Sequence, residues 1–212
     1  MANHGFLKRD GRNLSMSDFD DALSAALNLD NDFILSFFTP PQFRLLGLLA
    51  KDQNHTVQTI DLETLDAHGR NEHDASMSRL DRMQGDTIHV QTDLVEKILC
   101  DTVPEDYPNL NTSSFGRTRV RREKESRAAG SGEPESNTTI TPGIAEAALP
   151  FIFIGEGLGE DVNKMIVKKE MMREWMDFER IPKGFRRSKR AIGAADFGPI
   201  LASVKGWREH WS

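Results

Sequence analysis

The chain has 212 residues, with 27 Lys and Arg against 33 Asp and Glu, so its formal net charge is −6 at pH 7. This acidic balance argues against a protein that wraps nucleic acid as a whole, and a mean hydropathy of −0.51 is typical of a soluble globular chain. The single cysteine, Cys100, excludes an intrachain disulfide framework and every multi-cysteine zinc or iron–sulfur site.

The N-terminal part of the chain predicts short helices. Ser15 or Ser17 is the expected N-cap of the first, whose apolar residues recur at helical spacing as far as Leu27. A second helix is expected to run through Phe38 and to end at Pro40-Pro41. Two further helices are expected, a short apolar one from Phe43 to Leu49 and a weaker one marked by Leu62, Leu65 and His68.

The later part also follows helical patterns. An apolar stripe from Val90 to Leu99 predicts an amphipathic helix that ends at Cys100, and the charged residues 117–129 predict another. Thr141 as N-cap and Pro142 at the first helical position begin the most apolar helix. Residues 162–179 predict a long Met-rich helix. No β-strand alternation exceeds these patterns, so the sequence predicts an all-α fold. No apolar run reaches the roughly 18 residues that a membrane span needs.

Three segments invite functional readings that the residues alone do not favour. Gly155-Glu156-Gly157-Leu158-Gly159 lacks the strand that precedes a dinucleotide-binding loop, so a loop after a helix is preferred. Two basic clusters lack aromatic residues spaced for base stacking, so solvated faces are expected. The clusters are Arg117, Arg119, Arg121, Arg122, Lys124 and Arg127, and Lys183, Arg186, Arg187, Lys189 and Arg190.

The segment Glu72-His73-Asp74-Ala75-Ser76 is different, because three consecutive ionisable side chains lie next to a hydroxyl. Histidine titrates near neutral pH, and an adjacent carboxylate can fix its tautomer. Glu72 and Ser76 could offer oxygen ligands to a hard cation. A solvated surface segment is the alternative reading.

Glu146 is the one acidic residue of an otherwise apolar segment, Ile144 to Phe151. Its carboxylate either faces solvent or is buried in a way that suits proton transfer. The spacing alone leaves both readings open.

Four segments of the chain resemble, in their sequence and in their order, the haem-thiolate haloperoxidase family of fungal chloroperoxidases and unspecific peroxygenases. Residues 2–13, Ala-Asn-His-Gly-Phe-Leu-Lys-Arg-Asp-Gly-Arg-Asn, look like the segment that follows the family's Pro-Cys-Pro haem ligand. Residues 72–79 match its Glu-His-Asp-x-Ser block. Residues 145–148 match the distal-helix glutamate segment, and residues 179–182 its Glu-Arg-Leu-Pro element.

The resemblance implies a compact multi-helix, chloroperoxidase-like domain over residues 1–212 that binds haem b and is secreted, as most members are. It implies Glu146 as the catalytic acid–base group toward hydrogen peroxide, with His73 and Asp74 orienting it. It also implies that Glu72, the His73 carbonyl and Ser76 hold Mg²⁺ or Mn²⁺ near a haem propionate. The expected substrates are hydrogen peroxide and a halide or small organic molecule.

The family's proximal cysteine should precede Asn3, and the sequence contains no Pro-Cys-Pro. We therefore expect a domain that is N-terminally truncated relative to the family. Cys100 matches no family motif and is expected to be a small buried residue or an incidental thiol.

The leading hypothesis is a haem-dependent peroxidase or peroxygenase, with this chain lacking the axial cysteine. A haem-free, catalytically inactive relative that acts as a helical binding module is the alternative. An RNA-binding role for the basic clusters is a third reading.

Overall fold

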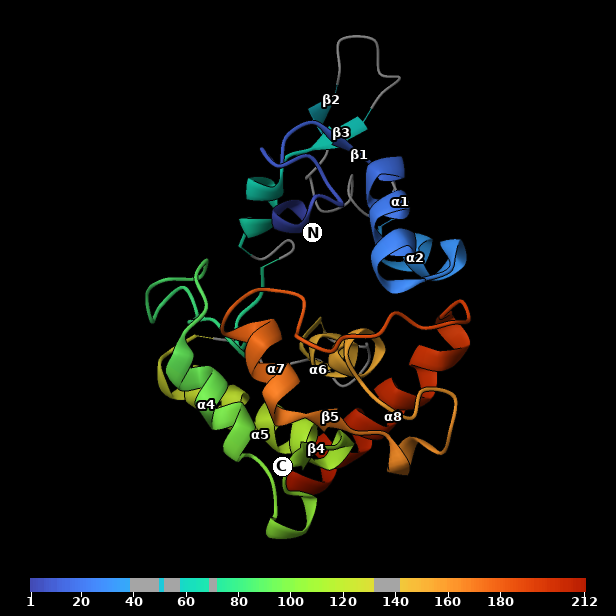
Figure 1. Cartoon of the computed structure of the whole chain (residues 1–212). Helices are drawn as coiled ribbons and strands as arrows, with labels where there is room; N and C mark the ends of the chain where they lie inside the picture. The colour runs from blue at the N-terminus through green and yellow to red at the C-terminus, as the bar shows by residue number, and fades with distance from the viewer. Residues whose placement is uncertain (39–49, 52–57, 69–71, 132–141) are drawn as a thin grey trace. The chain divides into compact units, whose positions relative to one another are not determined.

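The computed structural model describes residues 1–38, 50–51, 58–68, 72–131 and 142–212 (Figure 1). The described residues are mostly helical, with two small sheets, so the predicted all-α class is confirmed. Two compact units divide the chain. Unit 1 comprises Met1–Glu72 and Arg187–Ala194, and unit 2 comprises His73–Arg186 and Ala195–Ser212.

Unit 1 opens with a short 3₁₀ helix, η1 (Ala2–His4), and continues with two α-helices, α1 (Met16–Leu27) and α2 (Asn31–Phe38). Of the two serines predicted as N-cap of α1, the structure selects Ser15. Its hydroxyl accepts from the Asp18 amide at 3.2 Å, and the Asp18 carboxylate accepts from the Ser15 amide at 2.7 Å. This reciprocal capping box satisfies backbone groups that the first helical turn leaves open.

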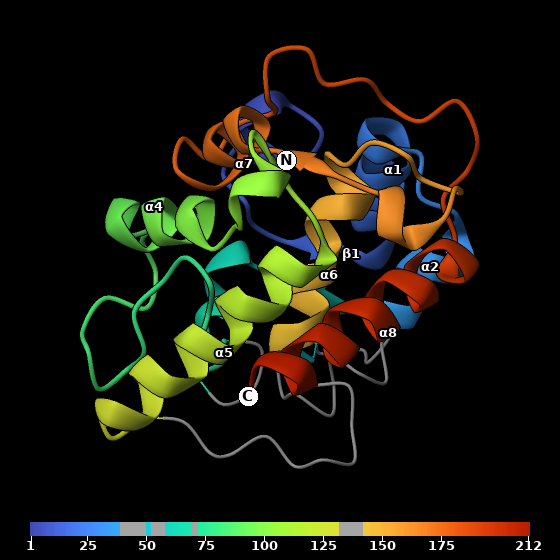
Figure 2. The same ribbon diagram turned by 90° about the horizontal axis from the view of Figure 1, so that it is seen from below.

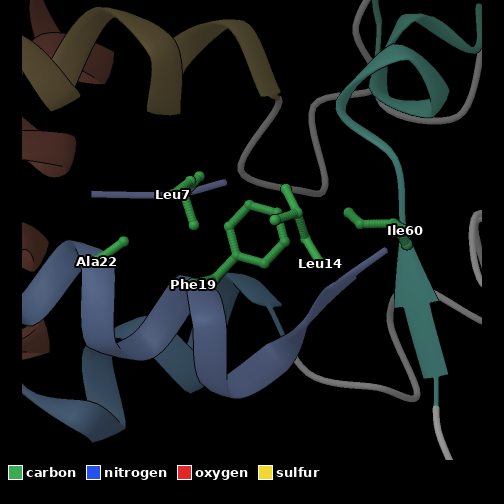
Figure 3. Close-up of a cluster of buried hydrophobic side chains, with 5 residues drawn as sticks. All are labelled: Leu7, Leu14, Phe19, Ala22 and Ile60. Atoms are coloured by element: carbon green, nitrogen blue, oxygen red, sulfur yellow. The ribbon is translucent and has the colours of Figure 1, made fainter. Parts of the chain in front are cut away.

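A three-stranded antiparallel sheet completes unit 1, in the order β1 (Leu14–Ser15), β3 (Gln58–Ile60), β2 (Ala50–Lys51). Apolar side chains of α1, β1 and β3 meet in one buried cluster (Figure 3). The cluster consists of Leu7, Leu14, Phe19, Ala22 and Ile60. The weaker helix expected at Leu62, Leu65 and His68 is present only as a 3₁₀ helix, η2 (Leu62–Asp66), which ends before His68.

The capping box makes the stability of unit 1 depend on pH. Hydrogen bonds from the Ser15 amide and hydroxyl hold the pKa of Asp18 below its ordinary value. A carboxyl whose pKa is lower in the folded state stabilises the fold above its unfolded pKa, and this contribution disappears as the pH falls through the folded pKa. We therefore expect Asp18→Ala to destabilise the protein above about pH 4 and to match the wild type in stronger acid. Urea unfolding between pH 2 and 7 measures this, and a difference that does not change with pH would contradict it.

Unit 2 is built on the long helix α5 (Thr112–Ala128), which contacts α4 (Thr92–Cys100) and α6 (Pro142–Phe153). The rings of Phe115 on α5 and Phe151 on α6 meet edge to face with centroids 5.2 Å apart. The C-terminal helix α8 (Ala194–Trp211) runs beside α5 (Figure 2). A Cβ at Gly116 of α5 would lie 2.6 Å from the Trp207 Cβ of α8, so this close approach requires glycine.

The smaller elements of unit 2 connect these helices. The 3₁₀ helix η3 (Pro104–Asp106) precedes strand β4 (Asn109–Leu110), and η4 (Val162–Lys164) precedes strand β5 (Val167–Lys168). β4 and β5 pair antiparallel, and α7 (Lys169–Met176) follows β5 directly.

The expectation of one long helix over residues 162–179 is therefore wrong. Pairing with β4 makes residues 167 and 168 extended, so tertiary contacts override the helical spacing of the methionines. The helices predicted around 90–100 and 117–129 are present as α4 and α5, and Pro142 begins α6 as expected. The predicted helix from Phe43 to Leu49, the break at Pro40-Pro41 and the Thr141 cap fall outside the described residues. Within the described residues, no helix is long and apolar enough to cross a membrane.

Candidate functional site

The carboxylate of Glu146 is the centre of a polar cluster in unit 2. Glu146 lies in the second turn of α6, and its side chain is 20% exposed. The Ser76 hydroxyl donates to its Oε1 at 2.9 Å, and the Met77 amide donates to both oxygens, at 3.2 and 3.1 Å. Ser76 is 70 positions and Met77 is 69 positions from Glu146 in the sequence, so the fold brings the two predicted segments together.

His73 faces the same carboxylate. Its Nδ1 lies 2.9 Å from the Asp74 carbonyl oxygen, which can only accept, so Nδ1 carries a proton. The other ring nitrogen, Nε2, is 3.9 Å from Glu146 Oε2. The His73 side chain is 27% exposed, so a small molecule can reach this pair from solvent.

Two arginines of α5 lie beneath the site, contrary to the expected solvated face. The side chains of Arg119 and Arg122 are 0% and 1% exposed. Arg119 Nη1 is 3.9 Å from Glu146 Oε2, whereas Arg122 pairs with the fully buried Asp81 at 3.1 Å. A guanidinium is found buried only with such partners, because an unpaired buried charge is costly. The five basic residues of the second cluster are all exposed, so the expected solvated face is confirmed there.

Of the predicted cation ligands, Glu72 belongs to unit 1, whereas His73 and Ser76 belong to unit 2. In unit 1 the Glu72 side chain is only 9% exposed and pairs through Oε2 with the His68 Nδ1. Its Oε1 is buried and has no hydrogen-bond partner among the residues that the structure describes. An orphaned carboxylate oxygen of this kind suits a hard divalent cation. In unit 2 the Ser76 hydroxyl donates to Glu146, which leaves its lone pairs available to a metal.

Cys100 lies in the last turn of α4 and is exposed, so of its two expected roles the small buried residue is wrong and the incidental thiol is left. Gly157 and Gly159 follow α6 with φ of +84° and +89°, which confirms the helix-terminal loop expected there.

The sequence model of the family described as "Peroxidase, family 2" matches residues 1–190. The chain belongs to peroxidase family 2. No curated protein sequence matches it.

Peroxidase family 2 membership supports a peroxidase-type function and implies hydrogen peroxide and an oxidisable substrate. The described residues fit the acid–base half of such chemistry, because a half-buried carboxylate and an imidazole meet at Glu146. They include one thiol, Cys100, which is exposed in the last turn of α4.

The sequence reasoning missed the Met77 amide and the Arg119 guanidinium as partners of Glu146. A backbone amide leaves no signature in a sequence. Arg119 could have been found, because Phe115, Arg119, Arg122 and Ser126 are spaced i, i+4, i+7 and i+11 on one buried face of α5.

Proposed function

We propose that this family 2 peroxidase is a haem-dependent peroxidase or peroxygenase that uses hydrogen peroxide to oxidise a halide or a small organic substrate. The observation that supports this most strongly is the Glu146 carboxylate, which faces His73 Nε2 at 3.9 Å in a position that solvent can reach. Family membership does not favour the haem-free binding module as an alternative.

The role of Glu146 is to move a proton between the two oxygens of the peroxide. Its Oε1 accepts from the Ser76 hydroxyl, both oxygens accept from the Met77 amide, and Oε2 also faces His73 and Arg119 at 3.9 Å. The Glu146 carboxylate is the group that takes a proton from the peroxide, because general acid–base catalysis requires such a group within hydrogen-bond reach. His73 Nε2 can then accept a hydrogen bond from the protonated carboxyl, since the other ring nitrogen, Nδ1, donates its own proton to the Asp74 carbonyl oxygen. Haem, when bound, supplies the redox chemistry of peroxide cleavage.

The experiment that tests this function uses the complete natural protein as isolated. We expect a haem absorption band and oxidation of bromide or of a phenolic or aliphatic substrate that depends on hydrogen peroxide. A folded protein with neither property would overturn the proposal.

A divalent cation at Glu72 is the second part of the proposal. The buried Oε1 of Glu72 is expected to be a ligand of Mg²⁺ or Mn²⁺, as the family resemblance implies. We expect Glu72→Gln to lose the metal that elemental analysis finds in the dialysed wild type. Glu63→Gln is the matched control, because the Glu63 side chain is 70% exposed on η2. Equal metal content in wild type and Glu72→Gln would contradict the assignment.

A further inference from the structure

Ala75 has a backbone conformation that its side chain disfavours. Its φ is +59°, in the left-handed region where a Cβ is crowded. Ala75 immediately precedes Ser76 and Met77, the two residues that donate to Glu146. A residue held in this region at a candidate site points to surrounding groups that impose it.

Buried charged groups hold both backbone atoms of Ala75. Its amide donates to Asp81 Oδ1 at 2.7 Å, and its carbonyl oxygen accepts from Arg119 Nη1 at 2.6 Å. The Asp81 and Arg119 side chains are both 0% exposed. These are charge-assisted hydrogen bonds in a dry environment, the strongest kind that a backbone group forms.

The Arg119 guanidinium occupies a place that α6 leaves open. A Cβ at Gly143 would lie 2.2 Å from Arg119 Nη2, so only glycine admits the guanidinium there. Gly143 and Glu146 are three residues apart and lie on the same face of α6. The missing side chain therefore brings Arg119 Nη1 to 3.9 Å from Glu146 Oε2.

We infer that Arg119 is a positioning residue for Glu146. Its guanidinium packs against Gly143 and holds Ala75 in the left-handed conformation. This conformation directs the Ser76 hydroxyl and the Met77 amide toward the Glu146 carboxylate. This inference rests on the proposed function for its catalytic meaning. Its geometric content concerns this chain's own residues and can be tested without haem.

Amide hydrogen exchange of Met77 tests the geometry, because that N–H bonds to Glu146. We expect Arg119→Gln to raise the Met77 exchange rate by about tenfold or more while the Ile98 amide of α4 keeps its rate, as for a local opening. Gly143→Ala should have the same effect, since its methyl group fills the space that the Arg119 guanidinium occupies while Arg119 itself is unchanged. Gly198→Ala is the matched control: it also adds a methyl group to a helical glycine, but nothing lies within 4 Å of the new Cβ.

A rescue variant separates positioning from general loss of stability. Glycine adopts a positive φ without strain, so Ala75→Gly removes the strain that Arg119 opposes. We expect Ala75→Gly in the Arg119→Gln background to restore most of the Met77 protection. Unchanged Met77 exchange in both Arg119→Gln and Gly143→Ala, or no rescue by Ala75→Gly, would overturn the inference.

Turnover of the complete haem-loaded protein distinguishes this inference from the proposed function. If both hold, Arg119→Gln and Gly143→Ala lower the kcat with hydrogen peroxide and leave the KM for the oxidised substrate unchanged. If Glu146→Gln abolishes turnover while the Arg119 and Gly143 variants keep the wild-type kcat, the positioning role fails and the proposed function stands. If Glu146→Gln retains full turnover, the proposed role of Glu146 fails, and Met77 exchange still decides what Arg119 holds in place.

Discussion

Glu146→Gln is expected to lower the kcat for hydrogen peroxide turnover by about 10²- to 10⁴-fold, the usual contribution of a general acid–base group. Glutamine keeps the size of the side chain, and its amide oxygen can still accept from the Ser76 hydroxyl, which lies 2.9 Å from Glu146 Oε1. It removes the oxygen that faces His73 Nε2, so no group at that position can take a proton from the peroxide. Steady-state kinetics of the complete, haem-loaded protein measure the change.

Glu160→Gln is the matched control for this substitution, because Glu160 is an exposed acid in the loop after α6. It removes the same charge and should leave kcat unchanged. Equal losses in both variants would indicate an effect of net charge and would contradict a specific role for Glu146.

Arg122→Met is expected to lower the free energy of unfolding by about 3–5 kcal/mol, because it leaves the buried carboxylate of Asp81 without its ion-pair partner. Arg122 Nη2 lies 3.1 Å from Asp81 Oδ1, with side-chain exposures of 1% and 0%. The same guanidinium also donates to the Ser76 carbonyl oxygen at 2.6 Å, so its loss loosens the loop that carries Ser76. Urea unfolding measures the change in stability.

A second substitution shows whether the stranded charge causes the loss. Asp81→Asn removes the charge and keeps an oxygen that can accept from the Ala75 amide, which lies 2.7 Å from Asp81 Oδ1 in the wild type. The Arg122→Met/Asp81→Asn double variant should therefore be more stable than Arg122→Met alone. Arg121→Met is the control on the same helix, since the Arg121 side chain is 21% exposed and its ion pair with Asp101 contributes less. A loss no greater in Arg122→Met than in Arg121→Met would contradict the account.

The sequence reveals helices wherever local chemistry determines them. Ser15 with Asp18, and Pro142 at the start of α6, are capping signals that act over three or four residues, and both helices are present. The C-terminal helix α8 was not predicted, because it contains Gly198, Pro199 and Gly206, residues that usually interrupt a helix. Its buried contacts with α5 stabilise it despite them, and contacts of this kind are not visible in a local pattern.

The site shows the same division between local and long-range information. Glu146, His73 and Ser76 were singled out from their residue types and from the family resemblance, and the fold brings all three together. The groups that hold these three residues in place were not predicted correctly. Arg119 and Arg122 belong to a charged run that resembles a solvated face, and their burial depends on Gly143 of α6 and Asp81 of a distant loop. Such pairings arise only when the helices pack.

Whether Glu146 moves the proton in peroxide turnover is tested by following two quantities in Glu146→Gln. One is hydrogen peroxide-dependent oxidation by the complete haem-loaded protein, and the other is the Met77 amide signal, which reports that the loop is intact. Turnover is expected to be lost, while the Met77 amide stays protected from exchange because it can still donate to the amide oxygen that replaces Glu146 Oε1. Wild-type turnover in a variant whose loop is intact would contradict this role of Glu146.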